Sequence, residues 1–156
     1  MLARSPSVSI VIATRDRAHW IAETIESVEH QTFTDWELVI VDDGSTDDTE
    51  RVVARFAGDG RVRWVPRPPE GRSAARNHGI AVSSAPLVAF QDADDLWEPA
   101  KLARQVDALA ADPAAGLCYT AARFIDATGT TLGMRKPPEP LAGNALPRLA
   151  RGNVII

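Results

Sequence analysis

Three closely spaced carboxylates, Asp92, Asp94 and Asp95, follow the mostly apolar residues 87–91. An apolar run bounded by polar residues is typical of a buried parallel strand, and open α/β sheets bind ligands where such strands end. Clustered carboxylates repel one another unless a cation neutralises them, and oxygen ligands suit Mg²⁺ or Mn²⁺, which in turn hold phosphates. The segment therefore predicts a divalent-metal site. The alternative is a polar turn in which Asp95 or a neighbour caps a helix.

A second acidic pair, Asp42 and Asp43, ends the predicted strand at 36–41, where a dinucleotide-binding fold carries the acidic residue that contacts a ribose. The turn at 13–17 contains no glycine, however, so the G-x-G-x-x-G fingerprint of a classical NAD site is absent. The G-x-x-x-x-G-K-[ST] pattern of a P-loop is absent too. From the residues alone, Asp43 could accept a hydrogen bond from a nucleotide base or serve only as a turn residue.

Two arginines, Arg72 and Arg76, lie in a predicted helix that begins near the same edge of the sheet. Guanidinium groups form strong, charge-assisted hydrogen bonds with phosphates, so both residues could offset the charge of a bound nucleotide. The alternative is that they are solvated charges on the surface of the helix.

Apolar periodicity predicts strands and helices in alternation along most of the chain. Strands are expected at 8–13, 36–41, 62–65, 87–91, 116–119, 122–125 and 130–134. Helices are expected at 18–30, 47–57, 71–83 and 99–111. This order is typical of an α/β fold with a doubly wound, mostly parallel sheet and helices on both faces. Because right-handed crossovers place the strand ends at one edge, residues 14–17, 42–45 and 92–95 should meet there.

Composition narrows the class of protein. The net charge of −4 and the lack of a basic stripe argue against a nucleic-acid-binding protein. The single cysteine, Cys118, excludes an internal disulfide, fits a reducing compartment and is expected to be buried filler. No run approaches the roughly 20 apolar residues of a membrane span, and no signal peptide is evident. We therefore expect a location in the cytoplasm or at the inner face of the membrane.

Five segments agree in order and spacing with one known family. They are residues 8–14, residues 31–33, the run Val-Asp-Asp-Gly-Ser-Thr-Asp at 41–47, residues 71–77, and the run Asp-Ala-Asp-Asp at 92–95. Together they resemble the family 2 glycosyltransferases, which have the Rossmann-like GT-A fold. The resemblance implies a nucleotide-sugar donor, most often a UDP-sugar, and metal-assisted transfer to an acceptor hydroxyl with inversion. It leaves open whether the acceptor is a carbohydrate such as a cell-surface polysaccharide, a lipid or a protein.

The resemblance also implies roles for individual residues. The nucleoside pocket would be lined by three residues of the first turn: Ala13, Thr14 and Arg15. Asp43 would accept a hydrogen bond from the base, and Arg72 would lie near the nucleotide. Asp92 would lie by the ribose and the metal, and Asp94 would ligate the Mg²⁺ or Mn²⁺ that bridges the diphosphate.

The chain departs from the family pattern in its first turn, where Ala-Thr-Arg-Asp at 13–16 replaces the frequent Pro-Thr-Tyr-Asn. Arg15 could stack on the base in place of the tyrosine. An inverting transfer also needs a carboxylate that takes the proton of the acceptor hydroxyl. In the family this residue lies beyond a segment resembling 152–156. We therefore expect one domain over 1–156 that is truncated before the acceptor-binding part, with its catalytic base past Ile156.

Two other functions remain as alternatives. One is a nucleotide-binding module without catalysis, which the missing base supports for this chain. The other is a phosphatase or phosphoacceptor domain, because Val41-Asp42-Asp43 is similar to the acidic strand ends of both. The common phosphatase pattern needs a second aspartate two positions after the first, and position 44 is glycine.

Overall fold

The computed structural model describes residues 5–135. Internal contacts divide the chain into two compact units, Met1–Ala103 and Arg104–Ile156. The expectation of one truncated domain over 1–156 stays a prediction. The predicted irregular segment around Pro137 and the apolar end at 154–156 lie outside the described residues.

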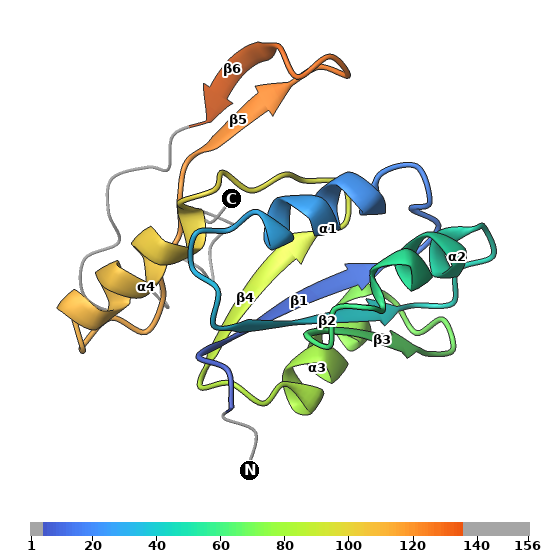
Figure 1. Cartoon of the computed structure of the whole chain (residues 1–156), viewed down its shortest axis with the longest axis horizontal. Coiled ribbons are helices and arrows are strands. Elements are labelled where there is room, and N and C mark those ends of the chain that lie inside the picture. Colours follow the sequence, from blue (N-terminus) through green and yellow to red (C-terminus); the bar gives the residue numbers. More distant parts are fainter. Residues whose placement is uncertain (1–4, 136–156) are drawn as a thin grey trace. The chain divides into compact units, whose positions relative to one another are not determined.

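The first unit is built on a parallel sheet of four strands with the order β3-β2-β1-β4 (Figure 1). The strands are β1 (Val8–Thr14), β2 (Trp36–Asp42), β3 (Val62–Pro66) and β4 (Leu87–Asp92). Nearly every residue of the central strands β1 and β2 is buried, which explains their continuous β-branched runs. In register, Thr14 pairs with Asp42 and Ala13 pairs with Asp92, so the carboxyl ends of β1, β2 and β4 meet at one edge, as expected.

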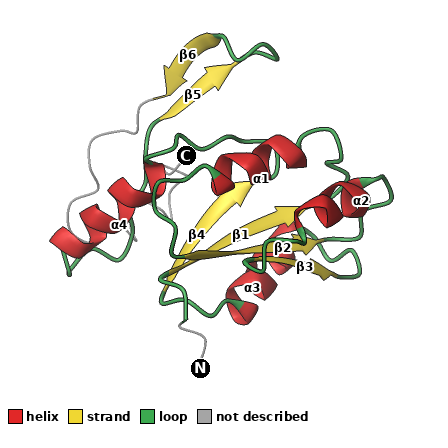
Figure 2. Cartoon of the chain, in the orientation of Figure 1, coloured by secondary structure: helices red, strands yellow, loops and turns green. Residues whose placement is uncertain are grey.

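Helices cover both faces of this sheet, which confirms the doubly wound α/β prediction (Figure 2). They are α1 (Ile21–Glu29), α2 (Thr49–Val53), which continues as a 3-10 turn at Ala54–Phe56, and α3 (Arg72–Val82). On the face of α3, Ala75 packs in a buried cluster with Val11, Val39 and Val41. Helix α3 approaches β1 closely at Gly79. A Cβ at this position would lie only 2.3 Å from a methyl carbon of Val11, so a larger residue would not fit.

The second unit contains most of helix α4 (Lys101–Ala111) and a hairpin of β5 (Ala122–Ile125) and β6 (Thr131–Arg135). The predicted hairpin is therefore confirmed. The strand expected at 116–119 is wrong, because these residues have no strand partner within the described part of the chain. Cys118 is correspondingly only partly buried. Within residues 5–135, no helix combines the length and the apolar character needed to cross a bilayer.

Candidate functional site

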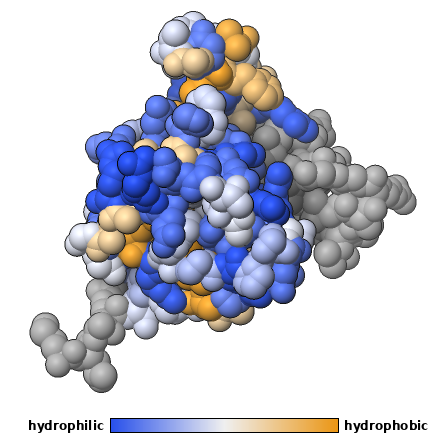
Figure 3. All heavy atoms as spheres, turned by 90° about the vertical axis from the view of Figure 1, so that its right-hand side faces the viewer, coloured by the Kyte–Doolittle hydropathy of each residue, from blue (hydrophilic) through white to orange (hydrophobic). Residues whose placement is uncertain are grey.

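Three loops lie at the carboxyl edge of the sheet: residues 15–18 after β1, 43–48 after β2 and 93–97 after β4. The first two are joined by the main chain, since the N–H of Asp43 donates to the carbonyl of Thr14 at 2.9 Å. This face of the molecule is mostly hydrophilic, apart from scattered apolar residues (Figure 3). The predicted convergence of the three acidic and basic clusters therefore occurs in the first unit.

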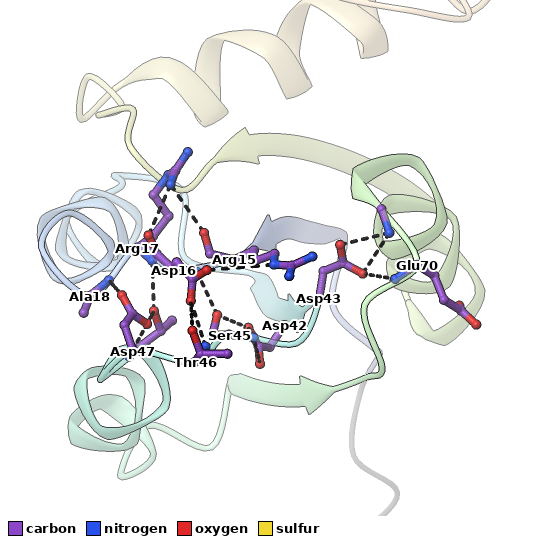
Figure 4. A network of polar contacts seen from close by, with 12 residues as sticks. Arg15, Asp16, Arg17, Ala18, Asp42, Asp43, Ser45, Thr46, Asp47 and Glu70 are labelled. Atoms are coloured by element: carbon purple, nitrogen blue, oxygen red, sulfur yellow. Dashed lines mark hydrogen bonds and ion pairs between the residues drawn. The ribbon is translucent and has the colours of Figure 1, made fainter.

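Asp16 fastens the first turn to the second loop (Figure 4). Its carboxylate accepts the N–H of Thr46 at 2.7 Å, while its own N–H donates to Ser45 Oγ at 2.9 Å. The hydrogen bond from the Thr46 amide is the main reason why the pKa of Asp16 is lowered. These bonds hold Asp16 at φ +51°, in the left-handed region that residues other than glycine rarely adopt. The shape of the first turn thus depends on the second loop.

Asp47 joins the same two loops, but here the accepting carboxylate lies on the second loop and the donor lies on the first. Its carboxylate accepts the N–H of Ala18 at 3.0 Å and the N–H of Thr49 at 3.0 Å, and the N–H of Arg17 donates to Thr49 Oγ1 at 2.9 Å. Burial alone would raise the pKa of Asp47, but the hydrogen bonds from Thr49 and Ala18 lower it. Residues 44–47, the Gly-Ser-Thr-Asp run, therefore hold the first turn in place through hydrogen bonds. Sequence reasoning missed this role, although short polar side chains in a turn signal such bonds.

The two carboxylates at the end of β2 are buried and already hydrogen-bonded. Asp42 accepts the N–H of Ser45 at 3.1 Å. Asp43 accepts the N–H of Glu70 at 2.7 Å and that of Gly71, the residue before α3, at 3.0 Å. Both aspartates are only 6% exposed, which gives no support to a phosphoacceptor role. An ionised carboxylate has about four acceptor positions, so Oδ2 of Asp43 keeps about one for a further donor such as a base N–H.

The carboxylates after β4 attract cationic groups. Arg76 Nη2 lies 2.5 Å from Asp92 Oδ1, and Arg17 Nε lies 3.3 Å from Asp94 Oδ2. The pKa of Asp95 is raised, first by desolvation of its carboxyl and then by the charges of Asp92 and Asp94. Two of the three carboxylates of this loop are therefore paired with arginines, and the predicted divalent-metal site stays a prediction.

Helix α1 holds this loop in place. Thr24 Oγ1 donates to the carbonyl of Ala93 at 3.0 Å, and the N–H of Trp97 donates to Ser27 Oγ at 3.2 Å. From within β4, the buried Gln91 donates through Nε2 to the carbonyl of Asp95 at 2.8 Å. The position of the acidic loop is therefore fixed by side chains of α1 and β4.

Among the described residues, no group of three or more Asp, Glu, His or Cys side chains is arranged to hold a metal ion. Mg²⁺ in nucleotide sites usually takes one or two carboxylates and completes its coordination with waters and substrate phosphates. Asp92 and Asp94 supply oxygen ligands of this kind, and both already attract a guanidinium. The donor set therefore fits a cation that completes its coordination with water and a diphosphate.

The other predicted site residues lie at or beside the same edge. Ala13 is partly buried in β1, and Thr14 is 3% exposed, with no hydrogen-bond partner for its Oγ1 in the described part of the chain. Arg15 is exposed, and its Nε lies 3.9 Å from Asp16 (Figure 4). Arg72 is exposed at the first residue of α3. The expected contacts of these residues with a nucleotide stay predictions.

Residues 9–153 match the family model Glycosyl transferase family 2. The chain belongs to this family. Over 132 residues it is 34% identical to the chondroitin synthase of Escherichia coli. This alignment covers 84% of this chain and 19% of that protein. Over 100 residues it is 36% identical to the E. coli UDP-Glc:alpha-D-GlcNAc-diphosphoundecaprenol beta-1,3-glucosyltransferase WfgD, covering 64% of this chain and 39% of WfgD. The matched part of the chain thus spans less than half the length of each of these relatives.

Solved structures agree with the expected fold. The mannosyltransferase PcManGT of Pyrobaculum calidifontis, in complex with GDP-Man and Mn²⁺, superposes with a TM-score of 0.64 at 29% identity, covering 80% of this chain and 37% of that one. S. aureus TarS 1-349 in complex with UDP-GlcNAc gives a TM-score of 0.64 at 24% identity, over 67% of this chain and 31% of TarS 1-349. The GT-A fold expected from the sequence is confirmed.

Proposed function

We propose that this chain carries the donor site of an inverting, metal-assisted glycosyltransferase. Its donor is a nucleotide-diphosphate sugar, and a UDP-sugar is the donor we expect. The observation that carries the proposal is the acidic loop at 92–95, which lies at the edge of the sheet where the first turn and Asp43 also lie. WfgD and PcManGT, whose names give UDP-Glc as donor and GDP-Man with Mn²⁺ as ligands, support this class of donor. The enzyme would act in the cytoplasm or at the inner face of the membrane.

Each residue would act on one part of the donor. Asp43 would accept a base N–H through its remaining acceptor position, and the exposed guanidinium of Arg15 would stack on the base. Arg72, at the start of α3, would lie near the nucleotide. Asp92 would lie by the ribose, and Asp94 would hold the divalent cation. When bound, this cation neutralises charge that develops on the departing diphosphate.

The catalytic base is proposed to lie past Ile156. Inverting transfer needs a carboxylate on the side of the anomeric carbon opposite the diphosphate. The carboxylates at the sheet edge would serve the donor side of the site. This chain alone would then bind the donor without transferring sugar, and the acceptor stays open among carbohydrates, lipids and proteins.

Calorimetry with UDP, GDP and dTDP, each with and without Mn²⁺, tests the donor site. We expect at least one nucleoside diphosphate to bind, and to bind more tightly with Mn²⁺. The matched control is Glu26→Gln, which changes an exposed carboxylate on α1 and should leave every affinity unchanged. Absence of binding by all three nucleotides in a folded sample would refute the proposal.

A further inference from the structure

Arg17 bridges the first turn and the acidic loop. Its Nε lies 3.3 Å from Asp94 Oδ2, and its Nη1 donates to the carbonyl of Asp16 at 3.2 Å. Figure 4 shows its side chain extending away from Asp47, on the opposite side of the turn. The guanidinium thus spans a gap between two loops that both belong to the donor site.

The main chain of Arg17 is hydrogen-bonded to the start of α2, while its side chain is partly exposed. Its N–H donates to Thr49 Oγ1 at 2.9 Å, within the fastening of the two loops. The side chains of Arg17 and Asp94 are 39% and 48% exposed, so water competes for their ion pair. An exposed ion pair of this kind is weak.

We propose that Arg17 holds Asp94 until a divalent cation arrives. A cation on Asp94 and the guanidinium of Arg17 would compete for the same carboxylate, because each is repelled by the charge of the other. The displaced guanidinium then turns to the diphosphate, for which its planar fork is suited. Cation binding and donor capture are thereby coupled through one side chain. This inference rests on the proposed donor site.

Competition between Arg17 and the cation predicts that loss of Arg17 raises the Mn²⁺ affinity, whereas loss of a purely structural bridge would not raise it. Removing the positive charge in Arg17→Gln frees Asp94 and removes repulsion of the incoming cation. Without nucleotide, Mn²⁺ should therefore bind more tightly, by roughly twofold to fivefold, the factor that corresponds to losing a competing exposed ion pair. At saturating Mn²⁺ the same variant should bind UDP more weakly, because the guanidinium that turns to the diphosphate is gone.

The experiment measures free Mn²⁺ by electron paramagnetic resonance, and UDP affinity by calorimetry at saturating Mn²⁺. Arg17→Lys keeps the charge and should keep the Mn²⁺ affinity near that of the parent. The matched control is Arg51→Gln on α2, which removes an exposed ion pair with Asp48, the residue before the helix, and should change neither affinity. Thermal unfolding verifies that each variant is folded.

Two outcomes separate this inference from the proposed function. If the parent binds Mn²⁺ and UDP but Arg17→Gln binds Mn²⁺ equally or less well, the competition is wrong and the donor site stands. If the parent binds neither, the donor site itself is wrong. Should Arg17→Gln not fold, NMR of the parent decides. Addition of Mg²⁺ without nucleotide should shift the Hε resonance of Arg17, and an unshifted resonance at saturating Mg²⁺ would overturn the inference.

Discussion

The carboxylate of Asp43 accepts the N–H of Gly71 at 3.0 Å and so joins the end of β2 to the N-terminus of α3. The same carboxylate is the proposed acceptor for the nucleotide base. One side chain thus supports the wall of the site and would also contact its ligand, so its removal should affect both the stability of the protein and its affinity for nucleotides.

Asp43→Ala should lower the free energy of unfolding by about 1–3 kcal/mol, because its charged hydrogen bonds to the N–H groups of Glu70 and Gly71 are lost. Nucleoside affinity should fall roughly tenfold or more, with or without metal, since charged hydrogen bonds are worth about 1.5–3 kcal/mol. Chemical denaturation and calorimetry measure the two effects. Asp43→Asn keeps one acceptor oxygen and should lose less stability. Unchanged nucleotide affinity in Asp43→Ala would remove the base contact from the proposal.

Asp94→Asn should separate metal binding from base recognition. The substitution keeps the shape of the side chain but removes the charge that would hold the divalent cation. We expect UDP to bind equally well with and without Mn²⁺, while the metal-independent affinity stays near that of the parent. Calorimetry at several Mn²⁺ concentrations measures this difference, with Glu26→Gln as the exposed carboxylate control. A metal dependence equal to that of the parent would contradict the assignment of Asp94 as a ligand.

The sheet and its edge could be predicted because each depends on local patterns. The β-branched runs of β1 and β2 and the polar residues after them fix both the strands and the place where they end. The hydrogen bond from the Thr46 N–H to Asp16 and the ion pair between Arg17 and Asp94 connect residues far apart in sequence, so no local pattern contains them. The strand expected at 116–119 failed for a related reason, because a short apolar run forms a strand only beside a hydrogen-bonding partner.

Glu37, near the start of β2, should make the stability of the protein depend on pH. Burial raises the pKa of this carboxyl, but hydrogen bonds from Ser9, Ser84 and Arg63 outweigh burial and lower it below 4.5. The associated stability is present above the unfolded pKa and is lost as the pH falls through the lower folded pKa. Chemical denaturation between pH 6 and pH 3 should show this loss in the parent.

Glu37→Gln should reduce the free energy of unfolding at neutral pH by about 1.5–3 kcal/mol, the usual worth of hydrogen bonds to a charged group. It should also flatten the decline in acid. Glu26→Gln, which changes an exposed carboxylate, should keep the decline of the parent. An equally steep decline in Glu37→Gln would assign the acid sensitivity to other carboxylates.

The chain of 156 residues should release nucleoside diphosphate from a donor far more slowly than a chain extended past Ile156. Asp94 and its cation would act on the leaving diphosphate, whereas the acceptor hydroxyl needs a base on the other side of the anomeric carbon. General-base assistance contributes about 10²–10⁴-fold in rate, and positioning of the acceptor is a comparably large factor. The extended chain should carry an Asp or Glu in its next stretch, and replacing that residue with Asn or Gln should reduce its rate to that of the short chain. The assay measures released diphosphate with donor, acceptor and Mn²⁺ on both chains, and UDP calorimetry verifies that both bind equally. Similar turnover by the two chains would place the base within residues 1–156, and the carboxylates at the sheet edge would then need new roles.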